Sequence, residues 1–348
     1  VHDEPKHNAR DCPMEAARRR RRLRMAIGAN VAALLVIVAY TLSLAYPPTE
    51  AVRLRTALLI EAGTDADFSW TPARPPADFM LERSVPPAQF VAVAHNPAAA
   101  AFARDWDKAL AYAGTLTSNA QDRGAIQSDL VTTYRAIVEE GRGYCADFVD
   151  AYLALAQAGG LGVRQWGFSF DGFGGHGHAF VEVFDRNFGK WVFLDVYNNV
   201  HAVDRASGIP LSALEFRDFI LGRGAPAEIR RNGPGRLGFR IEQKLIDYYR
   251  KGADEWYLWW GNNVFSYYDH PAVRVAERLS RPLAQLTAIA FGVHPTIKVL
   301  PTSTNAERLN AMLQLRIVLF GLAVAAIVLT AMLVILLWQL GRDPRAGT

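Results

Sequence analysis

The sequence predicts an α+β domain held between two membrane-spanning helices. Residues 25–46 and 317–338 contain no charged residue. Between them, apolar residues recur at helical spacing from about residue 98 to residue 158, then alternate with polar residues over 161–196, and return to helical spacing after residue 200. Helices and strands that follow one another in blocks are typical of an α+β fold.

Each uncharged segment has the length of a membrane span. At about 1.5 Å per residue, residues 25–46 and 317–338 each extend over roughly 33 Å, close to the thickness of a hydrocarbon core. Tyr46 and Trp338 stand at their ends, where aromatic residues anchor helices at the membrane interface. A cleaved signal peptide is the alternative for the first segment, with Ser43-Leu44-Ala45 as a cleavage site. Because the apolar stretch exceeds the roughly 7–15 residues of a signal core, we expect a retained anchor.

Arginines directly before the first segment predict its orientation. Arg18 to Arg22 and Arg24 precede it, and clustered basic residues stay on the cytoplasmic side. Two spans bring the C-terminus back to the same side, so residues 47–316 are expected outside the cytoplasm, at the inner (cytoplasmic) membrane. The net charge is only +4 and much of it lies in this arginine run, so we predict no nucleic-acid partner.

The expected elements divide the chain into seven segments. We expect helices at 100–116, 124–140, 145–158, 210–221, 240–262 and 271–291, strands at 161–170, 178–184 and 191–196, and a hairpin turn at 185–190. The proline-rich residues 47–101 predict irregular structure with a few edge strands or short helices. The segments are a disordered basic arm (1–24), a span (25–46), a lead-in with the first helix (47–119), a core (120–200), an aromatic-rich helical extension (201–316), a span (317–338) and a tail (339–348).

Three residues of the core have the chemistry of a cysteine nucleophile and its partners. The chain has two cysteines, too few for a disulfide scaffold, and we assign no function to Cys12. Cys145 begins a helix after a glycine-broken turn, where free N–H groups and the helix dipole favour a thiolate. His178 opens a strand after a glycine-rich loop, and Asp195 ends the paired strand. A base and a carboxylate that orients it are what such a nucleophile requires.

The segments around these residues resemble the transglutaminase-like superfamily. The resemblance lies in Gly141-Arg-Gly-Tyr-Cys-Ala-Asp-Phe148, in His178-Ala-Phe-Val-Glu-Val183 and in Trp191-Val-Phe-Leu-Asp195, over roughly residues 120–200. It implies a papain-like core and a Cys-His-Asp triad in this chain order. It also implies a cysteine peptidase, amidase or acyltransferase that acts on a peptide or protein and needs no cofactor. Similar domains fused to membrane helices occur in bacterial envelope and surface-polysaccharide systems, so envelope or glycan partners are an expectation by analogy.

Other interpretations of the same residues stay open. His176 competes with His178 as the base, although His176 lies in the glycine loop. His176, His178 and Glu182 have the spacing of a metal site on one strand face, as in cupins, and His201 follows without the expected context. Glu182 is otherwise a structural partner within the sheet. A non-catalytic scaffold in envelope assembly is the alternative function.

The aromatic-rich residues 256–268 have three interpretations. They form part of the core, they face the membrane interface, or they stack against sugar rings. Asn262 and Asn263 would bond sugar hydroxyls in the last case.

Overall fold

The computed structural model describes residues 13–96, 102–117, 124–126, 128–233 and 238–342. The chain divides into two compact units. Residues 55–313 form one of them, and the chain up to residue 54 together with the chain from residue 314 forms the other. Each unit is described by itself below.

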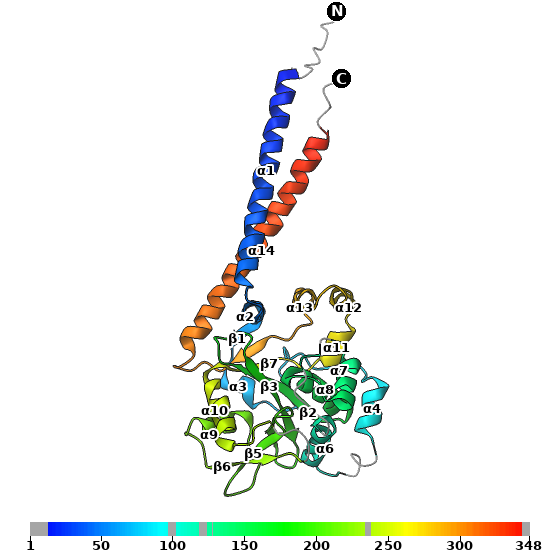
Figure 1. The fold of residues 1–348 in the computed structure, drawn as a ribbon, viewed down its shortest axis with the longest axis vertical. Coiled ribbons are helices and arrows are strands. Elements are labelled where there is room, and N and C mark those ends of the chain that lie inside the picture. Colours follow the sequence, from blue (N-terminus) through cyan, green and yellow to red (C-terminus); the bar gives the residue numbers. More distant parts are fainter. Residues whose placement is uncertain (1–12, 97–101, 118–123, 127, 234–237, 343–348) are drawn as a thin grey trace, which may run out of the picture. The chain divides into compact units, whose positions relative to one another are not determined.

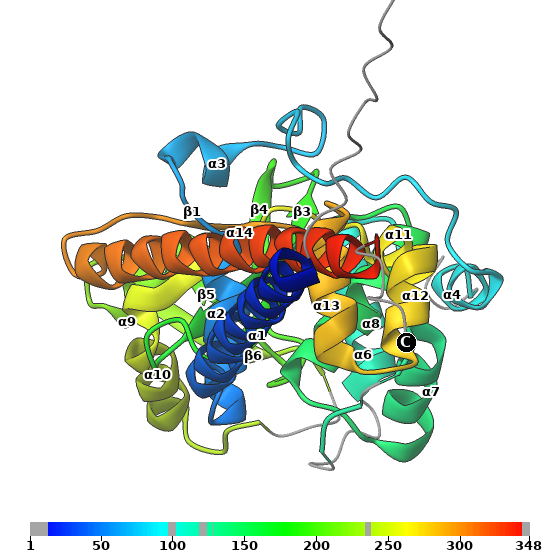
Figure 2. The same ribbon diagram turned by 90° about the horizontal axis from the view of Figure 1, so that it is seen from above.

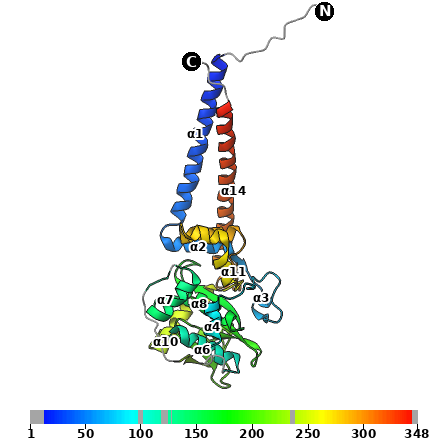
Figure 3. The ribbon, with the colours of Figure 1, turned by 90° about the vertical axis from the view of Figure 1, so that its right-hand side faces the viewer.

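Two long helices contain the apolar segments. Helix α1 (Pro13–Leu44) and helix α14 (Ala306–Arg342) are both uninterrupted (Figure 1, Figure 3). Both are long and apolar enough to cross a membrane, over Ala17–Leu44 and Ala306–Arg342. The expectation of a disordered basic arm is wrong for residues 13–24, which belong to α1, because arginine is a good helix former and the run continues into the apolar stretch. Cys12 and tail residues 343–348 lie outside the described residues.

The compact unit of residues 55–313 is built around a six-stranded sheet. The strand order is β1-β8-β7-β2-β3-β4, with a parallel β1–β8 pair and antiparallel pairs elsewhere. The strands are β1 (Ile60–Ala62), β2 (Gly162–Ser169), β3 (Gly177–Asp185), β4 (Lys190–Leu194), β7 (Trp256–Trp259) and β8 (Ile297–Val299). A second sheet pairs β5 (Val200–Asp204) with β6 (Ala227–Arg231).

Helices pack on both faces of the larger sheet. Figure 2 shows α9 and α10 on one side of the unit and α6, α7 and α8 on the other. The helices are α2 (Pro48–Leu59), α3 (Asp65–Ser69), α4 (Ala88–Ala94), α6 (Asp105–Thr117), α7 (Leu130–Glu140), α8 (Cys145–Ala158), α9 (Ala213–Ile220), α10 (Glu242–Lys251), α11 (Val264–Asp269), α12 (Pro271–Glu277) and α13 (Arg281–Ala290), with a 3-10 turn at Ala253–Glu255.

The alternation of side chains along the strands produces two separate cores. Val163 and Val181 face α8, and Phe148 and Tyr152 of α8 are fully buried in that core. Trp166 and Phe180 point to the opposite face, into an aromatic core that α9 and α10 cover. Successive strand residues point to opposite faces, so β2 and β3 each contribute side chains to both cores.

The helix predicted at 145–158 and the hairpin are confirmed, whereas two other predicted helices are wrong in part. The helix predicted over 240–262 stops at Lys251, and Trp256–Trp259 form strand β7 instead. Gly252 lies where a Cβ would come 2.1 Å from the Phe168 ring, so the chain turns there to pass the sheet. The helix predicted over 271–291 is two helices, because Ser280 starts α13 by accepting a hydrogen bond from the Leu283 N–H (3.3 Å).

Candidate active site

A short turn between α7 and α8 places Cys145 at the first position of α8. Gly143 has a φ of +115°, in the left-handed region, and a Cβ there would meet Phe148 and Asp147 at 3.3 Å. The Asp147 carboxylate accepts hydrogen bonds from the N–H groups of Tyr144 (2.8 Å) and Ile126 (3.2 Å), which fixes the helix start. Cys145 is partly exposed. The N–H groups of the first helical turn have no partner within the helix, so they can donate to a bound anion.

His178 stands between Cys145 and Asp195. Its Nε2 atom lies 2.7 Å from Asp195 Oδ2, and Cys145 is near enough to contribute to the raised pKa of the imidazole. Both the imidazole and the carboxylate are buried. The preceding residue, Gly177, allows this approach because a Cβ there would come 2.0 Å from the Phe168 carbonyl oxygen. The structure therefore brings together the three residues that the sequence analysis selected.

Asp195 is held by groups besides His178. The Asn198 backbone N–H and side-chain amide donate to its two oxygens at 2.8 and 2.7 Å, and the Tyr249 hydroxyl donates to Oδ2. Burial alone would raise the pKa of Asp195, but these hydrogen bonds and the charge of His178 lower it. Asp195 therefore remains a carboxylate in a buried position.

The same contacts favour a charged imidazole at His178. Burial acts to lower the pKa of His178, but the charge and hydrogen bond of Asp195, together with Cys145, outweigh burial and raise that pKa to about 10. At neutral pH His178 is therefore the positive partner of a buried ion pair with Asp195.

Two tyrosines of α10 complete the surroundings of His178. The Tyr248 ring centroid is 5.6 Å from that of His178, and the Tyr248 hydroxyl donates to the Gly177 carbonyl at 3.3 Å. The fully buried Tyr249 bonds Asp195. Tyr248, Tyr249 and Asn198 were not among the site residues predicted from the sequence. Asn198 could have been predicted, because it lies only three residues after Asp195 in a turn. The two tyrosines could not, because they lie beyond residue 200 in the segment that we expected to be a helical extension.

The structure does not support His176 as the base or a metal site at His176, His178 and Glu182. His176 is exposed and its Nδ1 atom lies 2.9 Å from Asp171, so it does not compete with His178 for Cys145. Glu182 pairs with Arg164 (2.7 Å) and accepts from the Ala213 N–H, which confirms its structural role. His201 instead bonds Asn232. Among the described residues, no three His, Cys, Asp or Glu side chains are grouped as ligands for a metal ion.

The aromatic-rich residues 256–268 contribute mainly to the core. Trp256, Trp260 and Phe265 are buried, which confirms the core-packing interpretation for them. The Asn262 amide donates to the Val163 carbonyl and the Asn263 amide to the Val293 carbonyl, so both side chains have hydrogen-bond partners within the domain.

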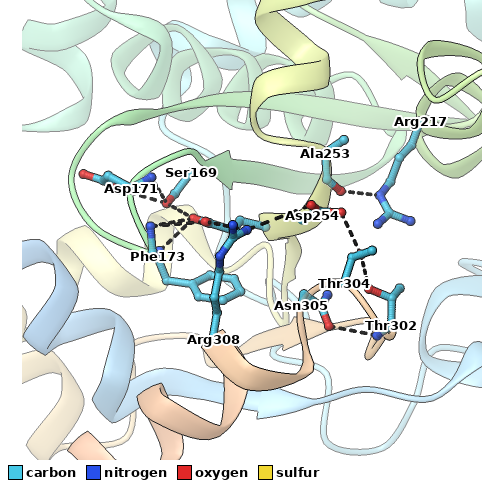
Figure 4. Close-up of polar contacts among 12 residues, drawn as sticks. Ser169, Asp171, Phe173, Arg217, Ala253, Asp254, Thr302, Thr304, Asn305 and Arg308 are labelled. Atoms are coloured by element: carbon cyan, nitrogen blue, oxygen red, sulfur yellow. Dashed lines mark hydrogen bonds and ion pairs between the residues drawn. The ribbon is translucent and has the colours of Figure 1, made fainter.

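A second buried carboxylate, Glu255, fixes the loop that leads to His178. It accepts hydrogen bonds from the Ser169 hydroxyl and from the N–H groups of Gly172 (3.0 Å) and Phe173 (2.8 Å). Arg308, near the start of α14, forms an ion pair with it at 3.2 Å, and Figure 4 shows Arg308 beside Phe173 and Ser169. Glu255 therefore holds the backbone of the glycine-rich loop at Gly172 and Phe173.

The comparisons with known proteins locate a family match around this site. Residues 97–196 match the family model of the transglutaminase-like superfamily, a stretch that contains Cys145, His178 and Asp195 and begins before the predicted start at residue 120. No curated protein and no solved structure matches the chain. The resemblance of residues 97–196 to the transglutaminase-like superfamily and the α+β fold are confirmed.

Proposed function

We propose that this domain is a thiol enzyme that cleaves or transfers the acyl group of an amide or peptide. The observation that carries the proposal is the position of His178, which pairs with the Asp195 carboxylate at 2.7 Å and has Cys145 near enough to contribute to its raised pKa. Nucleophilic catalysis requires a nucleophile, a neighbouring base and a carboxylate that orients the base, and these three residues supply one of each. Cys145 is partly exposed while the other two are buried, so a substrate reaches the sulfur first.

The proposed reaction has two halves. Cys145 Sγ attacks the carbonyl carbon, a C–S bond forms, and the negative charge on oxygen is held by N–H groups of the first turn of α8. The C–N bond then breaks and the leaving amine takes a proton from His178. In the second half water attacks the thioester carbon, His178 accepts its proton, and the C–S bond breaks to release an acid. An amine in place of water gives cross-linking, and we propose hydrolysis because water needs no second binding site.

We further propose that the reaction takes place outside the cytoplasm on a peptide or protein substrate. This location is supported by the six arginines before the first span and by two helices able to cross a membrane. Envelope or surface-polysaccharide processing is the setting in which such a tethered enzyme would meet its substrate.

The rate of Cys145 alkylation against pH tests the proposal. The protein is full-length, with Cys12→Ser so that Cys145 is its single thiol, and iodoacetamide is the reagent. We expect ready reaction at pH 6, and in His178→Ala a rate at pH 6 at least ten-fold lower that rises only towards pH 8.5, where ordinary thiols ionise.

His176→Ala is the matched control, because this second histidine is exposed and bonds Asp171 instead. Its profile should equal that of the parent protein. A thiol that reacts slowly at pH 6 in all three proteins would refute the working pair and favour the scaffold function. Release of amine from peptide amides, lost in Cys145→Ser, would then separate hydrolysis from simple thiol reactivity.

A further inference from the structure

Helices α12 and α13 form a hairpin with one buried and one exposed apolar face. Val273, Ala276, Ala284 and Ala288 are buried together in a small cluster of their own. Large apolar side chains on the other face are between 40% and 75% exposed: Val275, Leu279, Leu283, Leu286 and Phe291. We call these five residues the hairpin face. Single exposed apolar residues are common, but five of them within two helices that pack against each other indicate an interaction surface.

Basic residues accompany the hairpin face. Residues 271–292 contain three arginines, Arg274, Arg278 and Arg281, against one acidic residue, Glu277. Arg274 and Arg278 are exposed and line an open pocket with Asp129, Asp269 and Glu277, whereas Arg281 donates to the Ile126 carbonyl at 3.1 Å. Apolar residues on one face of a short helix with arginine beside them are typical of helices that lie in a membrane interface, where anionic headgroups attract the cations.

The hairpin lies where the chain enters the compact unit. Arg55 is the first residue of that unit, and its charge acts on Arg281 at the start of α13. Tyr267, which packs against the buried cluster of the hairpin, also interacts with Arg55. Figure 1 shows α2, whose residues 55–59 belong to this unit, at the same end as α13.

The covalent tether keeps this end of the unit close to the membrane. Residues 45–54 connect the end of α1 to Arg55, and residues 48–54 of this connection are helical. Three extended residues and seven helical ones reach about 20 Å in total. The headgroup layer begins directly at the end of a span, so a surface beside Arg55 is within reach of the lipid.

We propose that the hairpin face inserts into the headgroup–acyl boundary of the membrane that α1 and α14 are able to span, with Arg274 and Arg278 against lipid phosphates. A second copy of the chain is a poorer occupant. A symmetric dimer presents the same patch from both copies and would bring these arginines together. The proposal does not depend on the enzymatic function.

Spin-label depth measurements on the full-length protein in lipid nanodiscs test the proposal. The background is Cys12→Ser with Cys145→Ser, the labelled site is Leu286→Cys, and the discs contain zwitterionic and anionic lipid. We expect the nitroxide at position 286 to be several-fold more accessible to oxygen, relative to a water-soluble nickel complex, than a nitroxide at Phe188→Cys. Phe188 is a matched control because it is exposed in the β3–β4 turn, beside Arg186, which pairs with Asp105 of α6.

A second variant keeps the outcome interpretable. Val275→Glu with Leu279→Glu should bring the accessibility ratio at position 286 down to that of position 188, with an unchanged circular dichroism spectrum. Equal ratios at 286 and 188 in the background protein would overturn the proposal. Dipolar broadening between labels at 286 on two copies would overturn it as well, in favour of a dimer.

Discussion

At the scale of single residues, Tyr249 has the most consequential position outside the matched segment. It is fully buried and its hydroxyl donates to the carboxylate that orients His178. A hydrogen bond to a buried charge stabilises it by about 1.5–3 kcal/mol. Without the Tyr249 hydroxyl, the Asp195 carboxylate is less stable, so it stabilises the charged form of His178 less. Tyr249 acts through Asp195 and is a positioning residue.

Tyr249→Phe is therefore expected to lower the alkylation rate of Cys145 at pH 6 by about ten-fold, since 1.4 kcal/mol corresponds to one order of magnitude. The matched control is Tyr152→Phe, which removes another fully buried hydroxyl, bonded to the Ala109 carbonyl at 3.1 Å. Tyr152→Phe should lose about 1 kcal/mol of unfolding free energy and Tyr249→Phe about 1.5–3 kcal/mol, because only Tyr249 bonds a charged group. If the two variants alkylate at the same rate, Tyr249 has only a structural role.

At the scale of elements, Glu255 joins the loop before β3 to the start of α14. Removing its carboxylate in Glu255→Ala leaves the N–H groups of Gly172 and Phe173 without an acceptor, and we expect a loss of roughly 2–4 kcal/mol in unfolding free energy. Arg308→Ala should cost less than about 1 kcal/mol, because the arginine is half exposed and water screens the pair. Urea unfolding followed by tryptophan fluorescence measures both.

Arg223→Ala is the control for these variants, because it removes an exposed arginine that pairs with Asp218 at 3.0 Å. Amide exchange over residues 170–176 should speed up in Glu255→Ala and stay unchanged in the control. A stability loss in Glu255→Ala no larger than that in Arg223→Ala would show that the loop is held by other contacts.

The elements also show which features the sequence could predict. Helix α8 was predictable from local signals, since Gly143 precedes it and Gly159 ends it. Strand β7 was not, because its alternating burial exists only against β2 and β8, strands far away in sequence. The bond between Tyr249 and Asp195 joins residues 54 apart. No local pattern encodes such a contact, so the site could be predicted only for the residues within its own short motifs.

At the scale of the whole molecule, the charged pair of His178 and Asp195 lies among buried aromatic rings and links site chemistry to folding. His178 has a pKa of about 10 in the folded chain and an ordinary value near 6.5. The folded state therefore binds a proton more tightly than the unfolded state. This contribution to stability is fully present below pH 6.5 and is lost as the pH rises through about 10.

This linkage predicts how stability depends on alkaline pH. The unfolding free energy of the full-length protein minus that of His178→Ala should be largest at pH 6 and should shrink steadily through pH 8 to pH 10. Urea unfolding at each pH, followed by the fluorescence of Trp166 and the other buried tryptophans, measures this difference in unfolding free energy. His176→Ala is the control, and its difference from the parent should stay small at all three pH values, since His176 is exposed. If the difference in unfolding free energy between the parent and His178→Ala stays constant from pH 6 to pH 10, the imidazole is neutral in the folded protein. The proposed mechanism would then lack the imidazolium that gives a proton to the leaving amine.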